Sequence, residues 1–172
     1  MEIFKFLLRL KFCFCLIILS VATSTHAQQL ENYKLGSDDV ISVVVFDEPD
    51  LSISNARVSS SGTIAMPLIG QVEVRGLSIH EVEARIADLY LGDYLKNPDI
   101  SITIVEYRQF YVNGEVEKPG GYSYREGMTV QRAITLAGGF TERASRTNIK
   151  LIRESGNGTA IDATLSTTVQ PG

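Results

Sequence analysis

The sequence predicts an α+β fold made of two small sheet-and-helix units. Three observations support this prediction. Short runs of valine, isoleucine and other apolar residues, separated by turn residues, recur from residue 39 onward and are typical of strands. Two stretches, residues 78–90 and 129–137, carry apolar residues at helical spacing behind a capping residue. In both halves of the chain the strands come first, a helix follows, and further strands come after it.

The N-terminal residues 1–27 have the pattern of a secretory signal peptide. Lys5, Arg9 and Lys11 form a basic leader, and an uncharged, mostly apolar run follows over residues 12–21. Thr25-His26-Ala27 then offers small residues at the two positions that a signal peptidase reads. The apolar run is shorter than the roughly 20 residues that a spanning helix needs, so an uncleaved membrane anchor is the weaker alternative. We therefore expect a secreted protein.

Removal of the leader would also remove both cysteines of the chain. Cys13 and Cys15 lie within the apolar run, behind phenylalanines, whereas the cysteine of a lipoprotein signal follows the run behind small residues. We therefore expect no lipid anchor, and a chain without thiols excludes disulfides, thiolate metal sites and cysteine nucleophiles. The whole chain has 16 basic and 20 acidic residues, and this acidic balance without any basic run argues against nucleic acid and anionic lipid as partners.

The first unit is expected over residues 28–106 and should begin with strands. Residues 39–46 are almost continuously apolar and rich in valine, which predicts a strand buried on both faces. Residues 62–74 predict further strands, interrupted at Pro67 and Gly70, because proline has no N–H to donate to a ladder.

The helix of the first unit should begin at Ser78. The pattern Ser78-x-x-Glu81 is a capping box, in which the serine hydroxyl and the glutamate carboxylate bind backbone N–H groups reciprocally. Glu81 and Arg85 have the spacing of an ion pair on the solvent side of the helix. A strand with three isoleucines on one face, residues 99–105, follows and ends the unit. The apolar stripe of the helix consists of Ile79, Val82, Ile86, Leu89 and Tyr90.

The second unit, expected over residues 107–172, repeats this plan. Its helix should be capped by Thr129, and Gly138 stands where helices commonly end in a left-handed residue. The apolar stripe of that helix consists of Val130, Ala133, Ile134 and Ala137. The remaining expected parts are a strand at 110–114, a turn at 117–121, a strand around 122–124, and a hairpin of 148–153 with 160–165 across 155–158.

Two pairs of glycines in the second unit could indicate a phosphate site or turns. A P-loop needs a glycine followed by lysine, yet no glycine of the chain precedes a lysine, and G-x-G-x-x-G is absent as well. We therefore interpret the first pair as turn residues with positive φ behind a proline that presets the turn, and the second pair as a helix end. This structural turn motif consists of Gly114, Pro119, Gly120, Gly121, Gly138 and Gly139.

No catalytic or cofactor-binding arrangement stands out, so we expect a protein that is not an enzyme and binds no cofactor. His80 is the only histidine beyond the leader; we expect it on the helix surface, and no G-x-S-x-G motif offers a serine partner. Asp47, Glu48 and Asp50 crowd a presumed loop and could bind calcium, but the EF-hand spacing is absent, so we prefer a solvated loop. Two carboxylates that hydrolyse a glycoside stay open as an alternative, because nothing marks which two.

Motifs in both units resemble those of a known bacterial family. YKLGSDDVISVVVFDEPDLS, SSSGTIAMPLIGQVEVRGLS and YLKNPDISITI are similar to the polysaccharide export domain of capsule and exopolysaccharide exporters. Residues 110–153 are similar to the soluble-ligand-binding β-grasp (SLBB) domain that follows it in those proteins, most specifically in Gly114-x-Val116-x-x-Pro119-Gly120 and Leu136-Ala137-Gly138-Gly139. The resemblance implies an export domain at 28–106 and a β-grasp-like second unit at 107–172.

The chain departs from the family pattern in a few places. Asp38 and Ser61 stand where the family usually has glycine and aspartate, and an aspartate side chain can support a left-handed residue, so we expect an unchanged fold. Family members continue past the point that matches residues 169–172 into a final apolar strand, which we expect to be missing from the second unit. Larger members add a lipidated cysteine, more β-grasp domains and an outer-membrane helix; we expect a separate outer-membrane channel here.

The resemblance implies a periplasmic, non-enzymatic component of a polysaccharide export machine. Family members assemble as rings that line a passage for the polymer and meet an inner-membrane polysaccharide co-polymerase. Saccharide contact needs aromatic faces, for which Tyr107, Tyr111, Tyr122 and Tyr124 are candidates, although half-buried packing in strands is the alternative. Two other functions stay open: a monomeric periplasmic saccharide-binding or sensing module, and a small carbohydrate-active enzyme.

Overall fold

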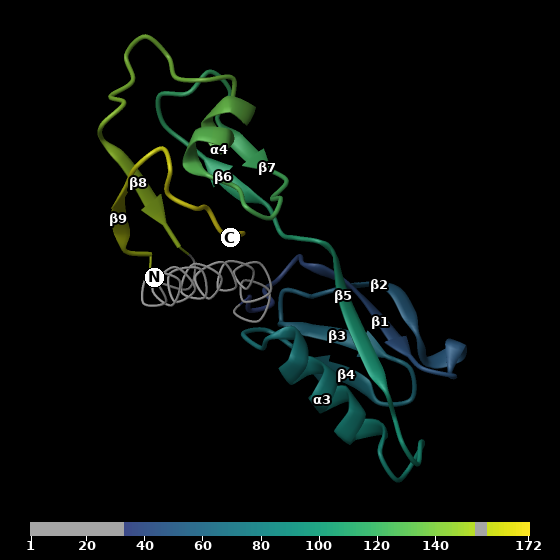
Figure 1. Ribbon diagram of the computed structural model, residues 1–172. Helices are drawn as coiled ribbons and strands as arrows, with labels where there is room; N and C mark the ends of the chain where they lie inside the picture. The colour runs from purple at the N-terminus through teal and green to yellow at the C-terminus, as the bar shows by residue number, and fades with distance from the viewer. Residues whose placement is uncertain (1–32, 154–157) are drawn as a thin grey trace, which may run out of the picture. The chain divides into compact units, whose positions relative to one another are not determined.

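The computed structural model describes residues 33–153 and 158–172 (Figure 1). The predicted signal peptide, and all but Gly158 of the turn predicted at 155–158, lie outside these ranges. The described elements are small antiparallel sheets and two α-helices, which confirms the predicted α+β class. Their bounds are β1 Val40–Val45, the 3-10 turn η1 Pro49–Leu51, β2 Ile53–Arg57, β3 Thr63–Met66, β4 Gly70–Glu73, α3 Ile79–Tyr90, β5 Ile100–Glu106, β6 Phe110–Val112, β7 Gly120–Tyr122, α4 Val130–Leu136, β8 Ile149–Ile152 and β9 Ala160–Ala163.

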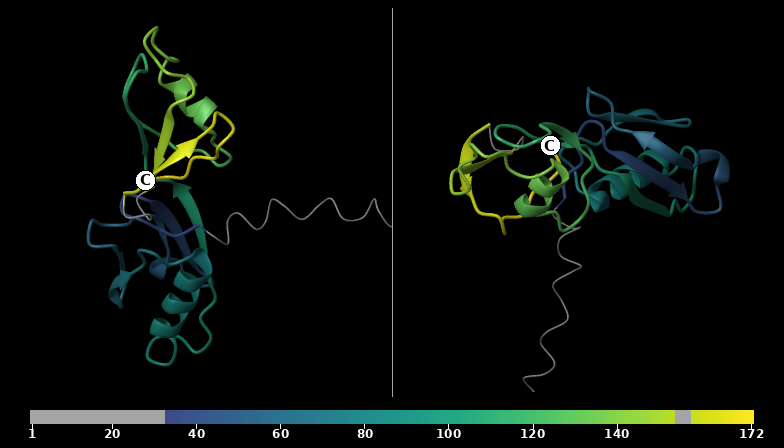
Figure 2. Two further views of the ribbon diagram at one scale, coloured as in Figure 1. Left: turned by 90° about the vertical axis from the view of Figure 1, so that its left-hand side faces the viewer. Right: turned by 90° about the horizontal axis from the view of Figure 1, so that it is seen from above.

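The first unit is organised around β1, the central strand of an antiparallel sheet with the order β2-β1-β5. Ile41, Val43 and Val45 are buried, and Val43 pairs with Ile102 of β5. Val44 points to the opposite face and is 48% exposed. The prediction that this strand is buried on both faces is therefore wrong, because one face of β1 stays open at Val44. Helix α3 packs beside the sheet, against β5 (Figure 2).

The strands predicted over residues 62–74 are β3 and β4, which pair as an antiparallel hairpin with its turn at Pro67, Leu68 and Ile69. The Ile69 N–H donates to the Pro67 carbonyl at 2.7 Å across Leu68, which has a φ of 64°. The Tyr90 hydroxyl of α3 donates to the same carbonyl at 2.9 Å. This contact ties the hairpin turn to the end of the helix.

Helix α3 begins at the predicted capping box. The Glu81 N–H donates to Ser78 Oγ at 3.4 Å, and the Ser78 N–H donates to Glu81 Oε2 at 2.6 Å. The predicted Glu81–Arg85 pair is wrong: the capping box occupies Glu81, whose Oε2 also binds Lys34 Nζ at 2.6 Å. Arg85 instead donates to the Glu73 carbonyl at 3.0 Å.

Helix α3 packs against β5. Its carboxylate Glu83 Oε1 accepts the Ile102 N–H at 2.9 Å and so satisfies a donor of that strand. Leu89 of the predicted stripe is 46% exposed. The helix residues that are buried are Val82, Ile86 and Tyr90.

The second unit has an apolar core of its own, formed by α4 with the hairpins β6–β7 and β8–β9. Thr129 caps α4 as predicted and accepts the Arg132 N–H at 3.4 Å. The strand predicted around 122–124 lies earlier, at Gly120–Tyr122, because Val112 of β6 pairs with Gly120. The buried core residues are Phe110, Val116, Met128, Val130, Ala133, Ile134, Ala137, Ala163 and Val169.

Within residues 33–153 and 158–172, no helix is both long enough and apolar enough to cross a membrane.

Candidate functional site

A buried carboxylate lies at the start of β1. Asp38 has a φ of 71°, the left-handed conformation that we expected an aspartate to support at this position. The Asp39 N–H donates to the Gly36 carbonyl at 3.3 Å, so the chain reverses over residues 36–39. This turn places Asp39 in the interior with 0% of its surface exposed. A buried carboxylate is costly unless hydrogen-bond donors and a cation surround it.

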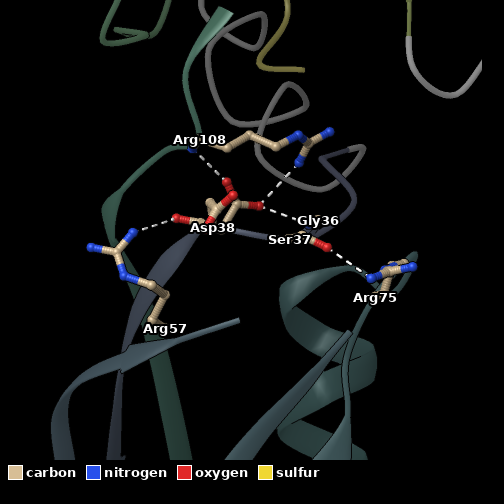
Figure 3. A network of polar contacts seen from close by, with 7 residues as sticks. Gly36, Ser37, Asp38, Arg57, Arg75 and Arg108 are labelled. Atoms are coloured by element: carbon tan, nitrogen blue, oxygen red, sulfur yellow. Dashed lines mark hydrogen bonds and ion pairs between the residues drawn. The ribbon is translucent and has the colours of Figure 1, made fainter. Parts of the chain in front are cut away.

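Arg108, two residues after β5, supplies both the cation and the donors (Figure 3). Its backbone N–H donates to Asp39 Oδ1 at 2.7 Å, and its Nη1 donates to Asp39 Oδ2 at 3.1 Å. The Gly36 N–H donates to the same Oδ2 at 2.8 Å. A Cβ on Gly36 would lie 2.4 Å from Arg108 Nη1, so the guanidinium requires glycine there. We call Gly36, Asp39 and Arg108 the joint cluster, because they tie the start of β1 to the segment between β5 and β6.

Two further arginines hold the same turn (Figure 3). Arg75, which follows β4, donates from Nη2 to Ser37 Oγ at 2.8 Å. Arg57 at the end of β2 donates from Nη1 to the Asp38 carbonyl at 3.2 Å. Both contacts are exposed, so each contributes little alone. Together these two contacts connect the turn at residues 36–39 to the ends of β2 and β4.

The joint cluster is suited to holding the chain and not to proton transfer. Both oxygens of the Asp39 carboxylate accept N–H groups, and the side chain has no exposed surface. A general base must reach the proton that it abstracts. Sequence reasoning missed this pair. The signs in the sequence are an aspartate directly before an apolar strand and an arginine two residues after another, but neither sign links one residue to the other.

The four tyrosines proposed for saccharide contact do not share one surface. Tyr111 on β6 is 70% exposed. Tyr122 packs with its ring centroid 6.0 Å from that of Phe110. Tyr107 and Tyr124 meet edge to face with their centroids 5.1 Å apart. The structure therefore brings Tyr107 and Tyr124 together and presents the ring of Tyr111 separately.

Burial raises the pKa of the Tyr107 and Tyr124 hydroxyls, and the nearby charge of Glu126 raises the pKa of both further. Both hydroxyls therefore stay protonated at neutral pH and keep a donor. Of the four tyrosines, Tyr111 has the most exposed ring, and the half-burial of the other three matches the packing alternative.

The predicted turn motif is confirmed at three of its glycines. Gly114, Gly138 and Gly139 have φ values of 97°, 85° and 96°. At the end of α4 the Gly138 N–H donates to the Thr135 carbonyl at 3.1 Å, and the Gly139 N–H donates to the Ile134 carbonyl at 2.9 Å. These two bonds form a Schellman motif, which ends the helix.

The turn prediction is wrong for Gly120 and Gly121. Both pair with β6 inside β7, with no positive φ, because the turn is already complete at Pro119. An added Cβ on Gly121 would lie 2.7 Å from Gln109 Oε1 and 3.0 Å from Tyr111 Cε1, so these two exposed side chains would have to move aside for it.

The other residues considered for chemistry lie on the surface of the first unit. Asp47 and Asp50 are exposed and Glu48 is half-buried. Within residues 33–153 and 158–172, no three His, Cys, Asp or Glu side chains are placed to hold a metal ion. The side chain of His80 is 79% exposed, as predicted, with Nδ1 3.0 Å from Glu83 Oε2.

Two known families match the chain, one over each of its two structural units. Residues 27–105 match the family described as polysaccharide biosynthesis/export protein, and residues 109–162 match the SLBB domain. The chain is 30% identical to the EPS I polysaccharide export outer membrane protein EpsA of Ralstonia nicotianae, over 70% of this chain and 38% of that protein. It is 28% identical to the exopolysaccharide production protein ExoF of Rhizobium meliloti, over 77% of this chain and 35% of that protein.

The chain thus spans less than two-fifths of the length of these relatives. The two matched regions correspond to the two structural units: the first contains β1 to β5 with α3, and the second contains α4 and the strands from β6 to most of β9. The family and the names of these relatives describe export and production of polysaccharide and no enzyme. The chain belongs to the bacterial family of polysaccharide export proteins.

Proposed function

We propose that this protein is a periplasmic component of a capsule or exopolysaccharide export machine, and that it guides the polymer across the periplasm towards the outer membrane. The observation that carries the proposal is the tandem of an export domain and an SLBB domain in one chain. Relatives named for polysaccharide export and exopolysaccharide production support it. The basic leader and short apolar run of residues 1–27 support delivery to the periplasm through a cleaved signal peptide.

We further propose that the protein acts by assembly. Copies would form a ring-shaped homo-oligomer, which meets an inner-membrane polysaccharide co-polymerase on one side and an outer-membrane channel on the other. A ring requires heterologous contacts that close by rotation, so every subunit must have the same geometry. The joint cluster suits this requirement, because it holds Arg108 through both its backbone and its side chain where the chain leaves β5.

Deletion of the gene tests the proposal. The expected result is loss of surface or secreted polysaccharide while lipid-linked repeat units are still made, because export lies downstream of their synthesis. The wild-type gene on a plasmid should restore the polymer. Normal surface polysaccharide in the deletion strain would contradict the proposal.

Two measurements distinguish the alternative functions. Analytical ultracentrifugation of the purified protein gives its mass in solution, and a single-subunit mass at every concentration would favour a monomeric saccharide-binding or sensing module. Incubation with the polysaccharide of the host strain tests catalysis, and turnover of that glycan would favour a carbohydrate-active enzyme.

A further inference from the structure

An open hollow of about 500 Å³ lies where β1 ends and β5 begins. The two strands are antiparallel neighbours, so residues 46–48 after β1 meet residues 95–99 before β5. The Phe46 N–H donates to the Asp99 carbonyl at 2.9 Å and fixes the two loops together. The volume falls within the range of about 300 to 1,000 Å³ that is usual for small-molecule sites. The hollow lies at the opposite end of β1 from the joint cluster.

An aromatic ring stands at this hollow. Phe46 lines it and is 66% exposed, although it directly follows a strand whose inner residues are buried. The face of an aromatic ring is electron-rich and attracts polarised C–H groups. A sugar ring presents several such C–H groups on one side. Phe46 therefore offers the kind of surface against which a sugar stacks.

Polar side chains with unused hydrogen-bonding capacity surround the ring. Asp47, Lys96, Asn97 and Asp99 line the hollow and are exposed. Among the described residues, their side chains make no hydrogen bond or ion pair with the protein. The backbone of Asp47 has a φ of 60°, the left-handed conformation that aspartate supports in turns, as at Asp38. The hollow therefore combines acceptors and donors with an apolar face.

The distribution of charge narrows the class of ligand. Asp47, Glu48 and Asp99 contribute three carboxylates to the lining of the hollow and Lys96 contributes one ammonium group, so the hollow is acidic. An anionic sugar such as a uronic acid would meet like charge. The carboxylates are too dispersed for a metal cluster within the described residues. Dispersed acceptors instead match the spaced hydroxyl groups of an uncharged sugar.

We propose that this hollow is a subsite for one uncharged sugar unit of a polysaccharide. Phe46 stacks on the ring of the sugar, and Asp47, Asn97 and Asp99 bind its hydroxyl groups. The inference rests on the proposed function, in which polysaccharide is the transported cargo, and adds the position and the class of sugar. It also places the contact on the first unit, and not at the exposed Tyr111 of the second.

The test is a titration of the ¹⁵N-labelled full chain followed by NMR. The probes are uncharged glucose hexasaccharides with β-1,3, β-1,4 and α-1,4 linkages, and hexagalacturonate as the anionic counterpart. We expect at least one uncharged hexasaccharide to shift the amide signals of residues 46–48 and 95–99 saturably, and hexagalacturonate to leave them unchanged. Absence of binding by all the uncharged probes, equal binding of hexagalacturonate, or shifts confined to other residues would overturn the proposal.

Matched variants locate the contact. Phe46→Ala should weaken binding by about 2- to 10-fold, the usual effect of losing an aromatic contact, and Phe46→Tyr should restore it. Tyr111→Ala removes an equally exposed ring elsewhere and should change nothing. Asn97→Ala is a second test that does not depend on the ring and should weaken binding too. Unchanged binding in both Phe46→Ala and Asn97→Ala would refute the assignment.

The outcome is separable from that of the proposed function. Sugar binding at the hollow together with normal surface polysaccharide in the deletion strain would refute the proposed export function and support the proposed subsite. Loss of surface polysaccharide in the deletion strain without sugar binding at the hollow would refute the proposed subsite and support the proposed export function.

Discussion

Replacement of Asp39 by asparagine should destabilise the protein strongly, although the two side chains have the same shape. The carboxylate accepts N–H hydrogen bonds from the backbone and the guanidinium of Arg108 and from the backbone of Gly36, and Asp39 is 0% exposed. An asparagine side chain has one acceptor oxygen and one NH2 group. At least one N–H donor would therefore face another donor, and the Arg108 guanidinium would lose its ion pair with this carboxylate.

The expected loss follows from the cost of removing one charge from a buried ion pair, about 3 to 5 kcal/mol. The Arg108 side chain is 16% exposed, and asparagine keeps one acceptor, so we expect the lower end of that range, about 3 kcal/mol. This is a large share of the roughly 5 to 15 kcal/mol by which domains are usually stable.

Urea unfolding followed by far-UV circular dichroism measures this loss. Asp38→Asn is the matched control, because it removes the same charge one residue earlier, from an exposed side chain, and asparagine tolerates the left-handed backbone there. We expect the control to change the free energy of unfolding by less than about 0.5 kcal/mol. If Asp39→Asn loses no more than Asp38→Asn, the role assigned to the buried pair is wrong.

Two further predictions concern a glycine and a carboxylate. Gly138→Ala forces a left-handed φ of 85° on alanine and should lower the free energy of unfolding by about 1 kcal/mol or more. Gly120→Ala is the control and should be nearly neutral, because Gly120 has an ordinary φ and nothing lies within 4 Å of the new Cβ. Equal losses of stability in thermal melts of the two variants would contradict this prediction. The Glu81 pKa is lowered from 4.5 to about 2, first by the Lys34 hydrogen bond and then by the bonds from the N-cap serine. Because the pKa of Glu81 is lower in the folded than in the unfolded state, the stabilisation from Glu81 is present above about pH 4.5 and disappears as the pH falls towards 2. Glu81→Gln should remove this contribution to the dependence of protein stability on pH. An unshifted Glu81 pKa in an NMR titration would refute the prediction.

Features that depend on neighbours in sequence were the most predictable. The capping box at Ser78 and the helix end at Gly138 are local patterns, so the sequence identified both. The Pro119-Gly120-Gly121 segment is equally typical of a turn, but pairing with β6 draws both glycines into a strand, and that pairing is not local. The same limit explains Val44, whose exposure depends on which face of the sheet packs into the core.

The sites depend still more on contacts that are distant in sequence. Asp39 and Arg108 are separated by 69 residues, and no spacing rule connects them. The acidic loop at Asp47 was visible in the sequence as a crowd of carboxylates. Its relation to Phe46 and to residues 95–99 exists only because β1 pairs with β5, which brings the two loops to one end of the sheet.

The dependence of Asp39 on Arg108 also affects how the chain can be divided and when it can fold. The two family matches end at residue 105 and begin at residue 109, so Arg108 belongs to neither. A fragment cut at the first of these limits would lack the ion pair and the backbone hydrogen bond that Arg108 gives the buried Asp39 carboxylate. A ribosome makes Asp39 69 residues before Arg108, and domains otherwise fold as units during synthesis. The export domain therefore completes its interior only after translation has passed the boundary that sequence similarity assigns to it.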